Sequence, residues 1–579
     1  MLTSQRTYHR AISIAAASCI VLAQAPAALA SSPDRPNIIL IMTDDQGYGD
    51  LGFTGDMVIQ TPHIDAMASR SARMEYFYVS PVCAPTRACL MTGRYNYRTR
   101  AIDTYIGRAR MEPDELTLAE ILHDAGYATG IFGKWHLGDN YPMRAMDQGF
   151  EQALVHRGGG IGQPSDPPGG EGRYTDAILF DNGRREQTKG YCTDVYFDRA
   201  MKWIQKVSDE NRSFFVYLPT NAPHGPFSDV PEDLYKEYKA NVKNDTQARI
   251  YAMITNIDQN VGRLFKWLDE LALTRNTMVI FMVDNGPNGV RHSAGLRGTK
   301  GSVWEGGIRS PFFAHWPARL KAGIASNRIA AHIDVLPTIL EACGVQAPQD
   351  LLLDGRSLLP LLEGRRVNWP DRTLFIQAHR GDIPILFNNF AARSQRWKLL
   401  HANGFGNETL NGPVNFELFD MLNDPLEKNN VAVERPQIVT ELEAQARAWF
   451  ADVSTTRPDN YAQPRIHVGT SHENPTVLTR QDWFHRKGGK WHPNSNGTWP
   501  LYVARRGRFD IHLRIRSLKH PALVELKVGG HHLSQQVEAN TLTHSFEGVV
   551  LGRGDTRLET FITYNNISKG AWQVTVEQR

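Results

Sequence analysis

Residues 83–87, Cys-Ala-Pro-Thr-Arg, combine a possible nucleophile with a permanent cation. Proline is tolerated in the first turn of a helix, so Pro85 predicts that a helix begins near Cys83. Backbone N–H groups at a helix start favour anions, and Arg87 lies one turn further along the same face. This arrangement suits a tetrahedral oxyanion. The alternative is a buried structural cysteine beside a surface arginine, and this stretch alone does not separate the two interpretations.

Two pairs of oxygen-bearing side chains follow apolar runs elsewhere in the chain. One pair is Asp44 and Asp45, and the other is Asp284 and Asn285. Such hard ligands suit Ca²⁺ or Mg²⁺ and not zinc. Each pair alone favours a simpler interpretation, a solvated turn for the first and a turn or helix cap for the second. Two pairs at predicted strand ends favour a shared cation.

Basic side chains form a third group of candidates. Lys134 and His136 are two positions apart, so in an extended segment both side chains point the same way. His224 follows another apolar run and lies between two nearby prolines, and Lys300 belongs to a glycine-rich stretch. A lone histidine in a loop is more often a surface residue than a catalyst, so His224 needs further support.

The elements that must position these residues are short apolar runs. Four of them end in the side chains named above: residues 37–42, 128–132, 214–218 and 278–283. Helical patterns lie between them, at residues 116–125, 195–207 and 249–271. This alternation predicts an α/β fold with a central, mainly parallel sheet sandwiched by helices. Ligands of such sheets bind at the carboxyl ends of strands, so we expect one shared site.

The pattern changes around residues 360–380. Strands at residues 393–400 and 416–420, then a helix over 435–450, predict a small α/β subdomain with an antiparallel sheet. Residues 453–475 are rich in Pro, Asn and Thr and predict a linker. Short alternating runs then predict a C-terminal β-sandwich: residues 500–504, 509–515, 523–528, 559–564 and 572–576. We therefore expect a catalytic domain (35–375), a small subdomain (376–452) and an accessory β-sandwich (475–579).

The N-terminus has the features of a secretory signal peptide, residues 1–30. Arg6 and Arg10 precede an apolar stretch at residues 11–25, and a small-x-small cleavage site ends at Ala30. The stretch is too short and interrupted to span a membrane well, so stable membrane insertion is not expected. We expect an exported protein, periplasmic or extracellular after cleavage near Ala30.

The stretch from Cys83 resembles the signature of the type I, formylglycine-dependent sulfatase family of the alkaline-phosphatase-like superfamily. That signature is Cys-x-Pro-Ser/Thr-Arg followed by Leu-Met/Leu-Thr-Gly, here residues 83–93. Residues 126–138 and residues 296–307 resemble two further motifs of the family. The resemblance covers roughly residues 35–450 in the family's order.

The resemblance implies a modified nucleophile and a metal. A formylglycine-generating or sulfatase-maturating enzyme would oxidise Cys83 to formylglycine (3-oxoalanine). Ca²⁺ would be bound by Asp44, Asp45, Asp284 and Asn285, with an oxygen of the converted Cys83 completing the shell. One hydroxyl of the hydrated aldehyde would attack sulfur, and the other would allow sulfate to be expelled.

The resemblance also implies roles for the basic residues. Arg87, Lys134 and Lys300 would stabilise charge on the sulfuryl oxygens. His224 would protonate the leaving oxygen, and His136 would deprotonate the remaining hydroxyl. Sequence spacing alone does not separate the acid from the base.

Long loops often carry binding residues, and two His-Arg pairs are candidates for substrate contact. His156 and Arg157 precede a Gly- and Pro-rich stretch, residues 158–170, and His379 and Arg380 follow the predicted main sheet. Both pairs suit sugar hydroxyls or carboxylates; the alternative is ordinary surface polarity.

The bulk composition sets outer limits. The 579 residues carry a formal net charge of +3 with dispersed Lys and Arg, so a nucleic-acid partner is not expected. We expect a sulfatase acting on sulfated carbohydrate. One alternative is a phosphomonoester or phosphodiester hydrolase of the same superfamily, and another is an inactive glycan-binding relative.

Overall fold

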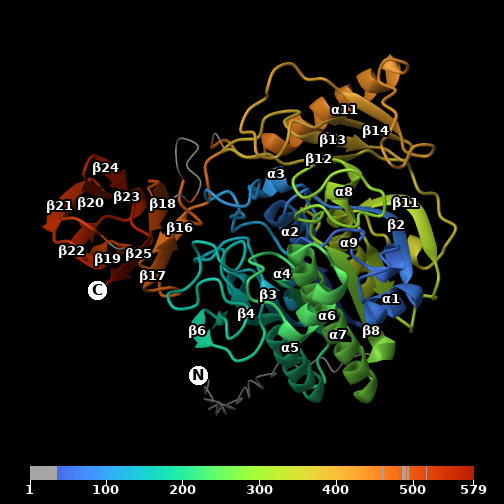
Figure 1. Cartoon of the computed structure of the whole chain (residues 1–579), viewed down its shortest axis with the longest axis horizontal. Helices are drawn as coiled ribbons and strands as arrows, with labels where there is room; N and C mark the ends of the chain where they lie inside the picture. Colours follow the sequence, from blue (N-terminus) through green and yellow to red (C-terminus); the bar gives the residue numbers. More distant parts are fainter. Residues whose placement is uncertain (1–34, 460, 485–490, 492–493, 517) are drawn as a thin grey trace, which may run out of the picture.

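The computed structural model describes residues 35–459, 461–484, 491, 494–516 and 518–579. The predicted signal peptide lies outside these residues. Figure 1 shows an α/β body coloured blue to yellow, an orange subdomain above it and a red, β-rich module to its left. Within the described part of the chain, no helix is long and apolar enough to cross a membrane.

A mixed sheet runs through the α/β body. Its order is β11-β2-β10-β8-β1-β7-β3-β4-β5-β6, with β9 (Arg309–Ser310) paired to β2. The central strands are mutually parallel: β8 (Thr277–Val283), β1 (Asn37–Thr43), β7 (Phe214–Pro219), β3 (Ala128–Lys134) and β4 (Gln152–His156). The flanking strands are β11 (Ala325–Ala331), β2 (Ala72–Tyr78), β10 (Phe312–His315), β5 (Ile178–Asp181) and β6 (Arg184–Gln187).

Alternation along β1 explains why helices cover both faces of the sheet. Ile38 and Leu40 point into one apolar cluster, and Ile39 and Ile41 point into another. The first cluster contains residues of α2 (Cys83–Thr92), α4 (Leu118–Asp124) and α9 (Val335–Cys343). The second contains residues of α1 (Pro62–Ser69), α5 (Cys192–Asp209) and α7 (Asp245–Glu270), against which α6 (Glu232–Asn241) also packs. The predicted helix-covered parallel sheet is confirmed.

The orange subdomain is an antiparallel sheet packed on one helix. Its strands are β12 (Leu374–Gln377), β13 (Phe390–Arg393), β14 (Trp397–His401) and β15 (Glu417–Asp420), and its helix is α11 (Pro436–Ser454). The single strand predicted over residues 393–400 is wrong. A turn separates β13 from β14, closed by the Ser394 N–H donating to Trp397 O at 2.9 Å.

The C-terminal module is the predicted β-sandwich. One sheet contains β16 (Ile466–Val468), β18 (Thr498–Val503), β20 (Ala522–Val528), β21 (His531–Val537), β23 (Gly554–Tyr564) and β24 (Ile567–Lys569). The other contains β17 (Thr476–Thr479), β19 (Gly507–Arg514), β22 (Thr543–Leu551) and β25 (Gln573–Gln578). The predicted linker, residues 453–475, is not all linker, because Ile466 and Val468 of β16 are buried in the sandwich core.

A buried charge network joins the subdomain to the α/β body. Lys398 Nζ on β14 donates to Glu305 Oε1 at 3.0 Å and to Glu427 Oε1 at 2.6 Å, and all three side chains are fully buried. Removing one partner of such a network leaves uncompensated buried charge.

We therefore expect Lys398→Met to lower the free energy of unfolding by about 3–5 kcal/mol. The control is Arg396→Ala, two positions before Lys398. It removes a half-exposed ion pair with Asp420 and should lower the free energy of unfolding by about 0–1 kcal/mol. Thermal unfolding followed by circular dichroism compares the variants. Equal melting temperatures would show that the network contributes nothing beyond a surface pair.

Candidate active site

Cys83 is the first residue of α2, and the whole helix is buried. Val82 before it is extended, and Gly93 ends the helix in the left-handed conformation (φ 66°) that glycine adopts without strain. Thr86 anchors the helix to the sheet, because its Oγ1 donates to Asp284 O at 2.7 Å just beyond β8. Cys83 is therefore held at the carboxyl edge of the central strands, 2% exposed.

Arg87 is fully buried, which excludes the surface arginine of the simpler interpretation. Its Nη2 donates to Asp284 Oδ2 at 2.8 Å, and its Nη1 donates to Lys134 O at 2.7 Å. Arg87 thus ties the ends of β8 and β3 together beneath Cys83.

The two pairs of oxygen-bearing side chains, Asp44–Asp45 and Asp284–Asn285, meet where the adjacent strands β1 and β8 end. The Asp45 N–H donates to Asp284 Oδ1 at 3.1 Å, and Asn285 Nδ2 donates to Asp45 Oδ1 at 2.9 Å. Asp44, Cys83 and Asp284 each place one atom that could bind a metal within 4.8 Å of the other two. Asp44 Oδ1, Asp45 Oδ2 and Asn285 Oδ1 are buried and accept no hydrogen bond from the described residues.

These orphaned oxygens fit a hard cation. Burying oxygen atoms without a partner is costly, and a Ca²⁺ or Mg²⁺ ion would satisfy all of them at once. Burial raises the pKa of Asp284, and the negative charge of Asp44 raises it further. Ionising all of these carboxylates at once is therefore unfavourable. A divalent charge among them would remove that conflict.

Basic groups surround the same oxygens. Lys134 Nζ donates to Asp44 Oδ2 and Lys300 Nζ donates to Asp45 Oδ1, each at 2.5 Å. His224 Nε2 lies 3.6 Å from Asp45 Oδ2. Although burial favours the neutral acid, Lys300 and His224 hold the pKa of Asp45 below its usual value.

His136 and His224 use one ring nitrogen each to hold the loops. His136 Nε2 is 3.0 Å from Thr104 O, and His224 Nδ1 is 2.7 Å from Gly225 O. Because carbonyls only accept, neutral rings leave a lone pair on His136 Nδ1 and on His224 Nε2. Burial lowers the pKa of both rings, to about 4 for His224. His136 also has a left-handed backbone (φ 60°), a conformation that non-glycine residues adopt uncommonly.

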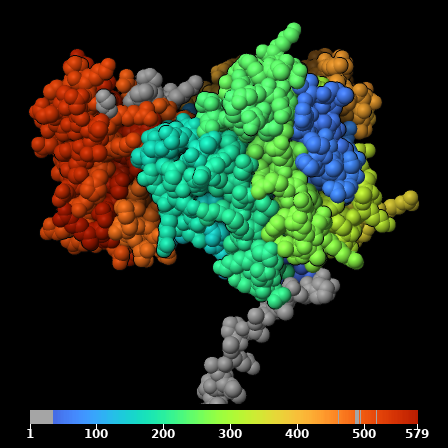
Figure 2. All heavy atoms as spheres, turned by 60° about the horizontal axis from the view of Figure 1, so that its bottom comes forward, coloured from blue at the N-terminus to red at the C-terminus, as the bar shows by residue number. Residues whose placement is uncertain are grey.

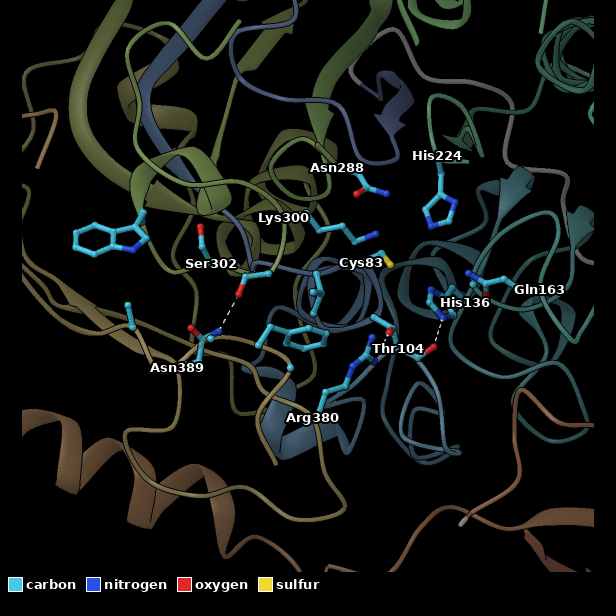
Figure 3. A pocket seen from close by; sticks show the side chains of 18 of the residues that line it. Cys83, Thr104, His136, Gln163, His224, Asn288, Lys300, Ser302, Arg380 and Asn389 are labelled. Carbon is cyan, nitrogen blue, oxygen red and sulfur yellow. Dashed lines mark hydrogen bonds between the residues drawn. The ribbon is translucent and has the colours of Figure 1, made fainter. Parts of the chain in front are cut away.

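A cavity of about 560 Å³ opens above Cys83 (Figure 3). His136, His224 and Lys300 surround the Cys83 sulfur, and Arg380 approaches from the opposite wall. Of the four substrate-contact candidates, only Arg380 lines this cavity. Its guanidinium lies over Tyr105 at 4.2 Å and over Phe405 at 4.3 Å.

The other three candidates lie elsewhere. His379 is buried and uses both ring nitrogens, on Arg380 O at 2.6 Å and on the Ile385 N–H at 3.0 Å, so it holds its own loop. His156 is buried with Nε2 at 3.2 Å from Asp166 Oδ1. Arg157 lies over Phe180 at 4.0 Å and lines a different cavity.

Several lining residues escaped the sequence analysis: Thr104, Gln163, Asn288, Ser302, Asn389, Phe405 and Trp491. They lie on irregular segments, and all except Ser302, which belongs to the motif at residues 296–307, lie outside the motifs named above. One available signal was the glycine run 158–160. A Cβ at Gly159 would lie 2.6 Å from His136 Nε2, and one at Gly160 would lie 2.8 Å from His224 Cε1, so these glycines let the loop approach both histidines.

The orphaned oxygens lead to a test of cation binding. After treatment with a chelator, adding Ca²⁺ should stabilise the protein by about 2.7 kcal/mol at an ion concentration 100 times the dissociation constant. The rise in melting temperature measures this. Asn285→Ala should lose most of the rise, whereas Asp258→Asn, a buried carboxylate on α7 whose Oδ1 accepts from the Ile64 N–H at 2.7 Å, should keep it. An Asn285→Ala variant that responds like its parent would exclude this ligand set.

Comparison with known proteins agrees with this geometry. Residues 36–345 match the family model described as Sulfatase, and residues 299–451 match N-sulphoglucosamine sulphohydrolase, C-terminal. The chain is 30% identical over 407 residues to N-acetylgalactosamine-6-sulfatase of Canis lupus familiaris, covering 65% of this chain and 75% of the relative. It is 32% identical over 511 residues to arylsulfatase A of Bos taurus, covering 77% of this chain and 93% of the relative.

A solved structure is also similar, that of Ps i-CgsB in complex with k-i-k-neocarrahexaose. The TM-score is 0.64 at 28% identity, and the match covers 73% of this chain and 94% of that one. Because the Sulfatase model spans more than half of the sequence and the bovine relative is matched over nearly its whole length, the chain belongs to the sulfatase family and is a sulfuric ester hydrolase.

Proposed function

We propose that this sulfatase releases sulfate from sulfated carbohydrate, using a formylglycine made from Cys83 and a Ca²⁺ ion held by Asp44, Asp45, Asp284 and Asn285. The observation that carries the proposal is the position of Cys83. Its sulfur lies at the base of a cavity, close to the carboxylates of Asp44 and Asp284, and Asp44 Oδ1 is buried without a hydrogen-bond partner among the described residues. An ordinary structural cysteine has no need of such surroundings.

Relatives support a carbohydrate substrate. The canine relative is named for N-acetylgalactosamine 6-sulfate chemistry, and the similar solved structure contains k-i-k-neocarrahexaose. The cavity is lined by three aromatic side chains, Trp304, Phe405 and Trp491, and by the guanidinium of Arg380. Flat apolar faces and a forked cation are the groups that bind sugar rings and their anionic substituents.

The hydrated formylglycine would supply the hydroxyl nucleophile, and the calcium ion would supply positive charge near it. Lys300 reaches the cavity with its charged end and would bind the sulfate group entering it. Lys134 and Arg87 are buried beneath and add positive charge from below. Buried charges that are already in position stabilise the negative charge that develops on the sulfate without having to reorganise.

The two histidines suit opposite proton transfers. His136 Nδ1 is buried without a partner among the described residues, and burial together with Lys134 keeps the ring neutral, so it is suited to accept a proton. His224 lines the cavity, and its Nε2 lies 3.6 Å from Asp45 Oδ2. The negative charge of a bound sulfate would favour the protonated ring, so His224 is suited to pass a proton to the leaving oxygen.

Export and maturation complete the proposal. Residues 1–30 would direct the chain out of the cytoplasm and be cleaved near Ala30. Because Cys83 is 2% exposed, a formylglycine-generating or sulfatase-maturating enzyme would act before α2 packs into the body.

Conversion and catalysis are tested on the same residue. After co-expression with a maturation enzyme, mass spectrometry of the Cys83 peptide should detect the aldehyde. Cys83→Ala should lower sulfate release by at least about 10⁴-fold, because the nucleophile is gone. Cys89→Ala, a second buried thiol in the same helix, is the matched control and should stay active. An active enzyme whose Cys83 is an unmodified thiol would contradict the proposed formylglycine nucleophile.

The module also reaches the proposed base. Gln481 Nε2 donates to Thr104 O at 2.9 Å, the same carbonyl that His136 Nε2 contacts. Gln481→Ala should lower kcat about tenfold with little change in KM, because one positioning hydrogen bond is lost. The control is Gln463→Ala, since Gln463 Nε2 donates to Ile106 O of the same loop at 3.1 Å but does not reach Thr104. An equal effect of both changes on kcat would mean general loosening of the loop.

A further inference from the structure

A second cavity of about 460 Å³ lies between the α/β body and the C-terminal module. The body contributes Arg144, Arg157, Arg184 and Arg185, and the module contributes residues 472–475 and neighbouring positions. In Figure 2 the teal surface of the body meets the orange and red surface of the module here. Among the described residues, this cavity shares no lining residue with the one above Cys83.

The second cavity is basic even after its internal ion pairs are considered. Its two acidic side chains are already engaged: Asp166 lies 3.2 Å from His156, and Glu473 accepts from the Tyr141 N–H at 2.9 Å. Glu473 also lies 3.8 Å from Arg157, and Arg144 pairs with Asp147 at 2.7 Å.

The remaining charge belongs to β6 at the edge of the main sheet. Arg184 and Arg185 are both exposed. Arg185 Nη2 donates to a neutral carbonyl, Pro168 O, at 2.5 Å, and Arg185 makes no ion pair within the described part of the chain. Arg184, on the same strand, has no ion pair or side-chain hydrogen bond to the described residues. Two guanidinium groups are therefore available to an anion, and their forked donors match sulfate and carboxylate groups.

Flat, weakly polar surfaces lie beside these charges. The Phe180 ring faces the Arg157 guanidinium at 4.0 Å, and the His472 ring stacks on Tyr141 at 4.4 Å between centroids and 6° between planes. Pro167, Pro168 and Pro475 line the same space. Rigid flat faces next to guanidinium groups suit a sugar ring that carries an anionic substituent.

One thin loop separates the two cavities. Gln163 lines the cavity above Cys83, and Ser165 lines the second one. Only one residue lies between them, so their Cα atoms are at most about 7 Å apart. The loop is held in place, because the Gly162 and Gly172 N–H groups both donate to Asp166 Oδ2, at 2.8 and 2.7 Å. The two cavities are therefore lined by neighbouring positions of one loop.

We propose that the second cavity binds an anionic segment of the same sulfated polysaccharide, remote from the ester being hydrolysed. This rests on the proposed function, since it takes the substrate to be a sulfated glycan chain. The cavity gives the enzyme a preference for long chains over short ones. Small sulfate esters fill only the cavity above Cys83 and do not depend on it.

The test compares a polymer with a small ester. Arg184→Glu should lower kcat/KM for a sulfated galactan polymer about tenfold, mainly through KM, because an attractive contact becomes repulsive. Hydrolysis of a small aryl sulfate should be unchanged. Arg366→Glu is the matched control: it makes the same charge change at an exposed arginine that lines neither cavity, and it should leave both rates unchanged.

Binding to a Cys83→Ala background separates recognition from turnover. Isothermal titration with the sulfated galactan should give a dissociation constant about tenfold weaker for Cys83→Ala/Arg184→Glu than for Cys83→Ala/Arg366→Glu. The desulfated polymer should bind both weakly and equally. Equal affinity of the two double variants for the sulfated polymer would overturn the second site. Failure of the parent enzyme to release sulfate from any ester would instead overturn the proposed function, while leaving the binding result interpretable.

Discussion

Three carboxyl groups, those of Asp44, Asp45 and Asp284, are buried side by side at the ends of two adjacent strands. Like charges in a desolvated site repel strongly, so this cluster exists only because cations are built around it. Lys134 and Lys300 provide two of these cations, and Arg87 provides a third from beneath. The oxygens that remain without partners among the described residues fit a divalent cation. Most other features of the site follow from this balance of charge.

The parallel topology explains why the cluster forms where it does. β1 and β8 are neighbours in register, with Thr43 beside Val283, so the residues that follow each strand must meet. β3 and β7 end at the same edge and deliver Lys134 and, a few residues later, His224. Helix α2 then points its first residue at this edge, with Thr86 bonded to the backbone of Asp284. Five separate segments of sequence thus converge because one sheet aligns their ends.

The sequence predicted the positions of the reactive side chains that lie at the ends of strands. It did not predict which side chains on the loops would line the cavity. Asp44, Asp284 and Lys134 directly follow or end apolar runs, so their convergence could be predicted from strand–helix alternation and family motifs. Arg157 and His379 are of the same residue types as Arg380 and His136, which line the cavity above Cys83, but each is directed by local loop packing that no periodicity encodes. β16 was hidden in a polar segment because three residues with two apolar positions give too short a pattern.

The C-terminal module is placed by contacts that resemble a protein interior more than a flexible connection. Met143 of the α/β body packs inside the module's own apolar core, and its carbonyl accepts from Trp135 Nε1, one residue before His136. In the segment that leads into the module, Tyr461 donates to Tyr97 O at 2.7 Å and Asp459 accepts from Arg100 at 2.6 Å. Both matched family models end by residue 451, so Asp459, Tyr461 and the whole module lie beyond them. Because buried contacts of this kind do not open readily, the module forms one wall of the second cavity and contributes Trp491 to the cavity above Cys83.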